Sequence, residues 1–248
     1  MQSRDGTGAY KRDNSEGWGK NQARSRMNIE HPYPNLEETL SFDRFSTYLA
    51  WAGGERNRAV ELYSLNTLLC ECLYVPLQIL EVTLRNRIHH VMSAAAGDTW
   101  FDLPGYQLNP TQTLMIAGAR EVLTDAKKPQ TPGAIVAAMT FGFWTAMFGK
   151  EYENLWQTTL HKIAKREDGK GLQRKNFAAP LGPIRMLRNR VAHHEPILYW
   201  SLPKHYANIQ QITRWLSPVA ADWSDAHSRF DEVFPKDGIT LVEPAVAD

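Results

Sequence analysis

The chain has 248 residues, with 28 lysines and arginines against 27 aspartates and glutamates, so its formal net charge is only +1. A content of 43% apolar and 22% charged residues is that of a globular protein and excludes the disordered and fibrous classes. This length allows one substantial domain or two small ones, with a core that needs no disulfide or metal. Near-zero charge argues against a protein that coats DNA or anionic membranes, although it leaves room for a local nucleic-acid site.

Residues 1–28 differ in composition from the rest of the chain. They are rich in glycine, serine, asparagine and glutamine and contain almost no apolar side chains, so they cannot bury enough surface to offset the entropy of ordering. Their six basic and three acidic residues leave 22 basic and 24 acidic residues in the remainder. We therefore expect a flexible basic tail over 1–28 and a single, slightly acidic folded domain over 29–248.

The cysteines and the hydropathy pattern indicate the cellular compartment. Only Cys70 and Cys72 are present, and they lie in an apolar helical pattern where buried, unreactive thiols are expected. The start of the chain shows no signal-peptide pattern, and charge or proline interrupts each apolar stretch before about 18 residues. We expect a cytoplasmic protein without a membrane span.

From about residue 36 onward, apolar residues recur at intervals of three and four, which is typical of amphipathic helices. Two such stripes cover 59–73 and 77–91, and Pro76 between them indicates either two helices or one kinked helix. Thr131 followed by Pro132 is typical of an N-cap and a first helical residue. No segment alternates as a strand does, so the predicted fold class is all-α, a single helical bundle. Helical periodicity is further expected over 111–126, 132–148, 152–163, from Gly182, 202–216 and 219–233.

The densest polar cluster lies on the helix expected to begin at Gly182. Asn189 and His193 are four residues apart and share one face of a helix, whereas Arg188 lies about 140° around the axis from His193. Pro196 disfavours further helix, which places His193 in the last turn, where the helix C-terminus favours a protonated imidazole. The cluster consists of Arg185, Arg188, Asn189, Arg190, His193, His194 and Glu195.

These residue types suit phosphodiester chemistry. An arginine can hold a phosphate with two hydrogen bonds and stabilise the charge of the transition state. A histidine can move a proton to or from a ribose hydroxyl near neutral pH. The alternative is an amphipathic helix whose arginines and histidines form a solvated face, and spacing alone favours that alternative.

Three sequence blocks, in this order, resemble the Abi-like (abortive infection) branch of the HEPN superfamily. They are LEVTLRNRIHH at 80–90 followed by Trp100 and Phe101, FGFWTAMFGKEYENLWQTTL at 141–160, and IRMLRNRVAHHEPI at 184–197. The last block contains the R-x4-H motif of that superfamily, and the resemblance covers roughly residues 45–216. It implies an all-α domain that forms a homodimer, with the two motifs meeting in a shared cleft.

The resemblance also implies a function and roles for the motif residues. Such proteins are metal-independent endoribonucleases that act as toxins or antiviral effectors, so RNA is the expected substrate and no cofactor or metal is expected. Arg188 would stabilise the phosphate, Asn189 would orient the substrate or the histidine, and His193 would be the acid/base. His194 and Glu195 match the usual ending of the motif, and Arg185 and Arg190 are expected to support substrate binding.

A second R-x4-H pattern, from Arg85 to His90, echoes the first. Arg85, Asn86 and His90 could form a second basic wall of the same cleft. The alternative is that Glu81 and Arg85 form an ordinary ion pair four residues apart on a helix.

Other chemistries have less support in the sequence. Six residues could supply zinc ligands, but the spacings typical of zinc sites are absent. No glycine-rich phosphate loop and no serine or cysteine nucleophile elbow is present. The histidine and glutamate candidates are His89, His90, His161, His193, His194 and Glu195.

Two functions remain open at this point. The first is an endoribonuclease in which attack by the 2′-hydroxyl gives a 2′,3′-cyclic phosphate and a 5′-hydroxyl end. The second is a non-catalytic helical module that binds RNA or a partner protein and regulates a defence system. Either function is compatible with a neutralising or sensor partner protein.

Overall fold

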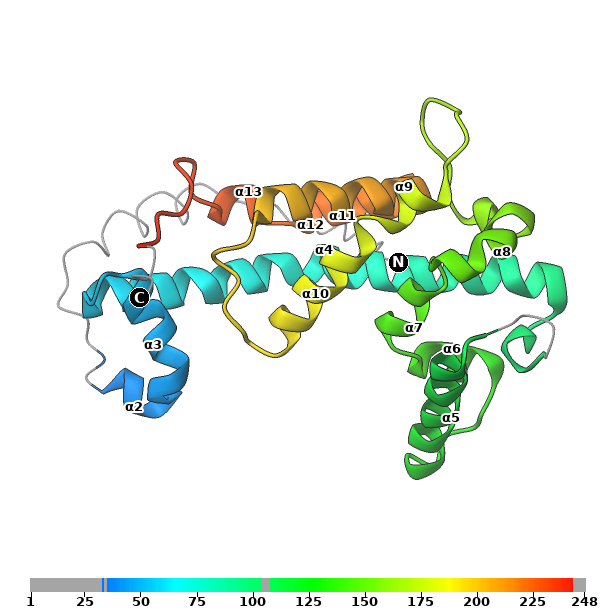
Figure 1. Cartoon of the computed structure of the whole chain (residues 1–248), viewed down its shortest axis with the longest axis horizontal. Coiled ribbons are helices and arrows are strands. Elements are labelled where there is room, and N and C mark those ends of the chain that lie inside the picture. Colours follow the sequence, from blue (N-terminus) through cyan, green and yellow to red (C-terminus); the bar gives the residue numbers. More distant parts are fainter. Residues whose placement is uncertain (1–32, 34, 104–107, 243–248) are drawn as a thin grey trace, which may run out of the picture.

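The computed structural model describes residues 33, 35–103 and 108–242 (Figure 1), and the expected tail at 1–28 lies outside these residues. Every regular element in the described part is a helix and none is a strand, which confirms the all-α class. The elements are α2 (Leu36–Leu40), α3 (Phe42–Trp51), α4 (Arg56–Ala96), η1 (Trp100–Asp102), α5 (Pro110–Asp125), α6 (Pro132–Ala138), α7 (Phe141–Ala146), η3 (Lys150–Tyr152), α8 (Glu153–Thr158), η4 (Leu160–Ile163), α9 (Arg174–Ala178), α10 (Leu181–Ala192), α11 (Leu202–Leu216), α12 (Pro218–His227) and α13 (Phe230–Val233).

The central element is α4, a helix of 41 residues that includes both apolar stripes and Pro76. The choice left open by the sequence is therefore resolved in favour of one helix. Buried side chains occur along its length, from Ala59 to Met92, and alternate with exposed ones on the opposite face. Figure 1 shows α4 running the length of the molecule, with α11, α12 and α13 along one flank and α2 and α3 at its N-terminal end. The other elements are thus positioned against a single long helix.

By length and composition alone, α4 is also long and apolar enough to cross a membrane. The core helix of a protein that stays in water meets the same criterion, and α4 packs against α3, α11 and α12. The absence of a membrane span therefore stays a prediction.

Two segments expected to be continuous helices are interrupted. Thr131 caps α6 as predicted, since its side-chain oxygen accepts a hydrogen bond of 3.2 Å from the N–H of Ala134. The segment does not continue unbroken to Phe148, because the backbone of Met139 is extended and α7 begins two residues later. Residues 152–163 are likewise divided into η3, α8 and η4, with Thr159 outside helical geometry.

The buried hydrophobic side chains of the described residues form one core. Trp100, Trp144 and Trp156 are among its largest members, whereas Trp223 is about half exposed. Cys72 is buried and Cys70 is half-buried, both are free thiols, and burial raises the pKa of Cys70 to about 11. These cysteines therefore behave as the small hydrophobic residues that the sequence predicted.

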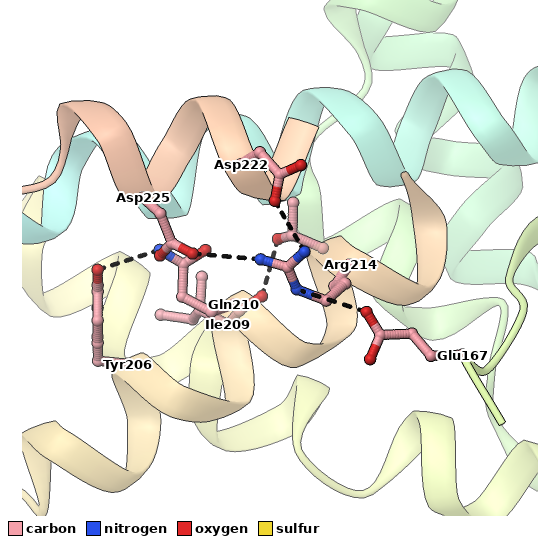
Figure 2. Close-up of polar contacts among 8 residues, drawn as sticks. Glu167, Tyr206, Ile209, Gln210, Arg214, Asp222 and Asp225 are labelled. Carbon is pink, nitrogen blue, oxygen red and sulfur yellow. Dashed lines mark hydrogen bonds and ion pairs between the residues drawn. The ribbon is translucent and has the colours of Figure 1, made fainter. Parts of the chain in front are cut away.

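Ion pairs join the C-terminal helices to the preceding loop. Figure 2 shows Arg214 of α11 between two carboxylates of α12, those of Asp222 at 2.8 Å and Asp225 at 3.3 Å. A third carboxylate, that of Glu167 in the loop before α9, lies 3.9 Å from Nε of Arg214. In addition, the N–H of Lys165 donates to the carbonyl of Trp215 at 2.8 Å. These contacts hold the polar stretch at 166–171 against the end of α11.

Candidate functional site

The arginines and the asparagine of the polar cluster lie on α10, as the periodicity predicted, whereas His193, His194 and Glu195 follow the end of this helix. Ile184, Leu187 and Val191 are buried and fix one face of this helix against the core. Arg188 and Arg190 are partly exposed, and Asn189 is exposed. The sequence pattern of α10 therefore turns the polar residues of the motif away from the core.

The end of α10 has a defined capping geometry. The helix ends at Ala192, and His193 is the cap residue, one position beyond the last turn that was predicted for it. His194 has φ 57°, in the left-handed region that histidine adopts more readily than most residues. Its N–H donates to the carbonyl of Val191 at 3.2 Å, and the N–H of Glu195 donates to that of Arg190 at 2.8 Å. This pair of bonds is a Schellman motif, which reverses the chain and leaves both histidines exposed.

Arg190 and Glu195 are used to hold this turn. Nε of Arg190 donates to the carbonyl of Pro196 at 3.0 Å, and Nη1 lies 3.1 Å from the Glu195 carboxylate. The guanidinium also lies over the ring of Tyr199, 5.3 Å from its centre. Arg190 was expected to support substrate binding, and Glu195 matches the usual ending of the motif; in the structure both side chains stabilise this turn.

Two residues that the sequence analysis did not select fix the same turn from outside α10. The side-chain oxygen of Asn66, a buried residue of α4, accepts a hydrogen bond of 2.8 Å from the N–H of Ile197. Nη1 of Arg44, from α3, donates to the carbonyl of His194. A buried asparagine in an apolar stripe is the sequence signal that could have identified Asn66.

Arg188 is paired with a carboxylate on the neighbouring helix. Its Nε and Nη2 donate to the two carboxylate oxygens of Glu81, at 3.1 Å and 3.4 Å. The sequence offered Glu81 as a partner of Arg85 on the same helix, and this alternative is not what the structure contains. Arg85 instead donates to the carbonyl of Ala137 and to the side chain of Asn86, both at 3.4 Å.

A groove of about 470 Å³ lies between this part of α4 and the C-terminal half of α10, with the pair of Glu81 and Arg188 in its lining. Three residues expected at the site line it together, namely Arg85, Arg188 and His194. A second pocket of about 510 Å³, which extends toward the turn between α12 and α13, shares Tyr74, Val191 and His194 with the groove. The groove is lined by Tyr74, Leu77, Gln78, Glu81, Val82, Arg85, Arg188, Val191, Ala192 and His194.

The other expected site residues lie elsewhere. His193 and Asn189 are exposed and outside the lining of the groove, one turn apart and joined by a backbone hydrogen bond of 2.9 Å. His90 lines a different pocket of about 310 Å³, together with Arg87 and Lys162. Arg185 is exposed, with its guanidinium close to Gly142 of α7. Of the second R-x4-H pattern, only Arg85 shares a groove with Arg188.

His89, one of the zinc candidates, has a structural role. Its Nδ1 accepts a hydrogen bond of 3.1 Å from the indole N–H of Trp100, and burial lowers its pKa. In the described ranges, no three histidine, cysteine or acidic side chains are grouped so that they could hold a metal ion.

No family model matches the chain, and neither a curated protein nor a solved structure is similar to it.

Proposed function

We propose that the chain is a metal-independent endoribonuclease of the Abi-like HEPN type, acting in the cytoplasm as a toxin or antiviral effector. The observation that carries the proposal is the groove whose lining contains two arginines, Arg188 and Arg85, and one carboxylate, that of Glu81, which pairs with Arg188. Such a groove favours an anionic ligand, and an RNA phosphate matches the geometry of an arginine fork. The exposed pair His193 and His194 ends the helix that carries Arg188.

The proposed reaction needs only proton transfer and charge stabilisation. His193 takes the proton of a ribose 2′-hydroxyl, and the oxygen attacks the adjacent phosphorus. The bond from phosphorus to the 5′-oxygen breaks, and that oxygen takes up a proton from the protonated His193 as it leaves. The products are a 2′,3′-cyclic phosphate and a 5′-hydroxyl end. Arg188 stabilises the charge that develops on the phosphate, and Asn189 orients the substrate or the histidine.

A homodimer is part of this proposal. His193 and Asn189 are exposed and outside the lining of the groove that contains Arg188, so one copy does not surround a phosphate with all three side chains. A second copy facing the first would bring an equivalent motif to the same cleft. A monomer in sedimentation at micromolar concentration would contradict this arrangement.

The test is an RNase assay with a chelator present. Wild type should cleave single-stranded RNA to cyclic-phosphate ends, and His193→Ala and Arg188→Ala should each abolish cleavage. Arg58→Ala, an exposed arginine paired with Glu61 on α4, is the matched control and should retain activity. Cleavage that survives both motif substitutions, or that requires a divalent cation, contradicts the mechanism.

A second candidate is a non-catalytic module that binds RNA or a neutralising or sensor partner protein. It is favoured by the position of His193 outside the groove and by the neutralising ion pair on Arg188. RNA binding that persists in His193→Ala, together with no turnover by wild type, would select this function.

A further inference from the structure

Glu81 is the one carboxylate in the lining of the groove that contains Arg188, and it contacts that arginine directly. The side chain of Glu81 is 21% exposed and that of Arg188 is 37% exposed, so the pair lies at the edge of the groove. The two residues come from different helices, α4 and α10, and the pair therefore fixes the guanidinium relative to the core helix.

The geometry of the pair shows which part of Arg188 remains available. A guanidinium has five N–H groups in a rigid plane, one on Nε and two on each terminal nitrogen. Glu81 accepts hydrogen bonds from Nε and from Nη2, whose N–H groups point outward along one edge of the planar guanidinium, called here the side edge. Both hydrogens of Nη1 and one of Nη2 are not used in this pair, and one from each nitrogen forms the end edge of the fork. That edge can accept two oxygens of a phosphate while Glu81 keeps the side edge.

We propose that Glu81 is a positioning residue, which holds the side edge of Arg188 so that the end edge faces the RNA phosphate in the groove. This inference rests on the proposed function. The arginine side chain is long and has several rotatable bonds, which the carboxylate restrains. Without the carboxylate the guanidinium loses its fixed orientation, so kcat falls.

The charge of Glu81 has the opposite effect on substrate affinity. Its carboxylate cancels the charge of Arg188 and leaves Arg85 as the net positive charge of the groove lining. Removing the carboxylate should therefore strengthen the attraction for the RNA backbone. A positioning role predicts that kcat and KM both fall in Glu81→Gln, a result that a loss of structure would not produce.

The experiment compares three variants in steady-state cleavage of single-stranded RNA. Glu81→Gln should lower kcat at least tenfold and lower KM. Glu81→Asp keeps the charge but shortens the side chain, and should lower kcat with KM unchanged. Glu61→Gln removes the same charge from an exposed position on α4, and should leave kcat at the wild-type value. A kcat that is unchanged or raised in Glu81→Gln overturns the proposal, and a raised kcat would identify Glu81 as an inhibitory contact.

A second measurement does not depend on activity. The Nε–H of Arg188 should give a 15N–1H signal that exchanges slowly with water in the wild type, and fast exchange should follow in Glu81→Gln. If the wild type does not cleave RNA, the proposed function fails. If exchange is equally fast in both proteins, the positioning role fails whatever the activity.

Discussion

The side chain of Asn66 accepts a hydrogen bond of 2.8 Å from the backbone N–H of Ile197, and both residues are buried. This bond joins the N-terminal half of α4 to the turn that follows α10. An N–H group buried without a partner costs about 1–3 kcal/mol. The bond therefore fixes the path of the chain after His193 and His194.

Asn66→Leu removes the acceptor and leaves the N–H of Ile197 unpaired in the core. We expect the free energy of unfolding to fall by about 1–3 kcal/mol, measured by urea denaturation. Thr67→Leu, at the next and exposed position of α4, should change stability little. Equal stability of Asn66→Leu and wild type would show that the bond contributes nothing.

His194→Gly should stabilise the fold, because a left-handed backbone costs a residue with a side chain about 1 kcal/mol that glycine does not incur. The hydrogen bonds of the turn use the backbone and remain. His193→Gly is the control, since His193 has φ −96° and gains nothing from glycine. The melting temperature should rise for His194→Gly and fall for His193→Gly. RNase activity is expected to fall in both variants. A lower melting temperature for His194→Gly would contradict the view that the left-handed backbone at His194 is strained.

Acidification from about pH 7 to pH 5 should lower stability. Burial lowers the folded-state pKa of His89 and of His205, so the unfolded chain binds protons more readily than the folded one. The stability that these histidines contribute is therefore present above the unfolded pKa of about 6.5 and is lost as the pH falls below it. The Glu37 carboxylate stays ionised in the folded protein throughout this range, since the hydrogen bond from Arg56 holds its pKa at about 2. Glu37 is therefore not a main cause of the loss of stability between pH 7 and pH 5. The measurement is the melting temperature across this range.

The contribution of His89 can be isolated with a neutral replacement. His89→Gln keeps an acceptor for the indole of Trp100 and should flatten the pH dependence of the melting temperature. His227→Gln alters an exposed histidine of α12 and should leave the dependence as in the wild type. Parallel pH profiles for His89→Gln and the wild type would assign the effect to other groups.

Arg214→Met removes the cation shared by three carboxylates (Figure 2). The partners are partly exposed, so we expect a loss of about 1 kcal/mol in the free energy of unfolding. The loss should shrink in 1 M salt, where exposed charges are screened. Arg58→Met, which breaks a single exposed pair, should change stability less. A loss independent of salt would indicate packing by the arginine stem instead.

The sequence predicted the elements whose signals are local. The cap at Thr131 and the helix over 111–126 depend on neighbouring residues, and the structure confirms both, with α5 beginning one residue earlier, at Pro110. The break at Met139 and Thr140 was missed because apolar periodicity does not record two extended residues between two short helices.

The site was predicted less completely because its contacts join distant parts of the chain. The partner of Arg188 is 107 residues away, and a nearer candidate for Glu81, at Arg85, fitted the helical spacing equally well. The use of Arg190 depends on the path of the chain after the helix, which places the carbonyl of Pro196 within its reach. Residue type and spacing identified the cluster, whereas the role of each member depended on tertiary structure.

Because α4 is one continuous helix, Asn66 and Glu81 are set by a common register. They lie about 22 Å apart along its axis. Asn66 contacts Ile197 in the turn after α10, and Glu81 contacts Arg188 on α10 itself. Inserting or deleting one residue between them would rotate one contact by about 100° relative to the other. Natural variants of this chain should therefore tolerate substitutions in the intervening stretch far better than changes in its length.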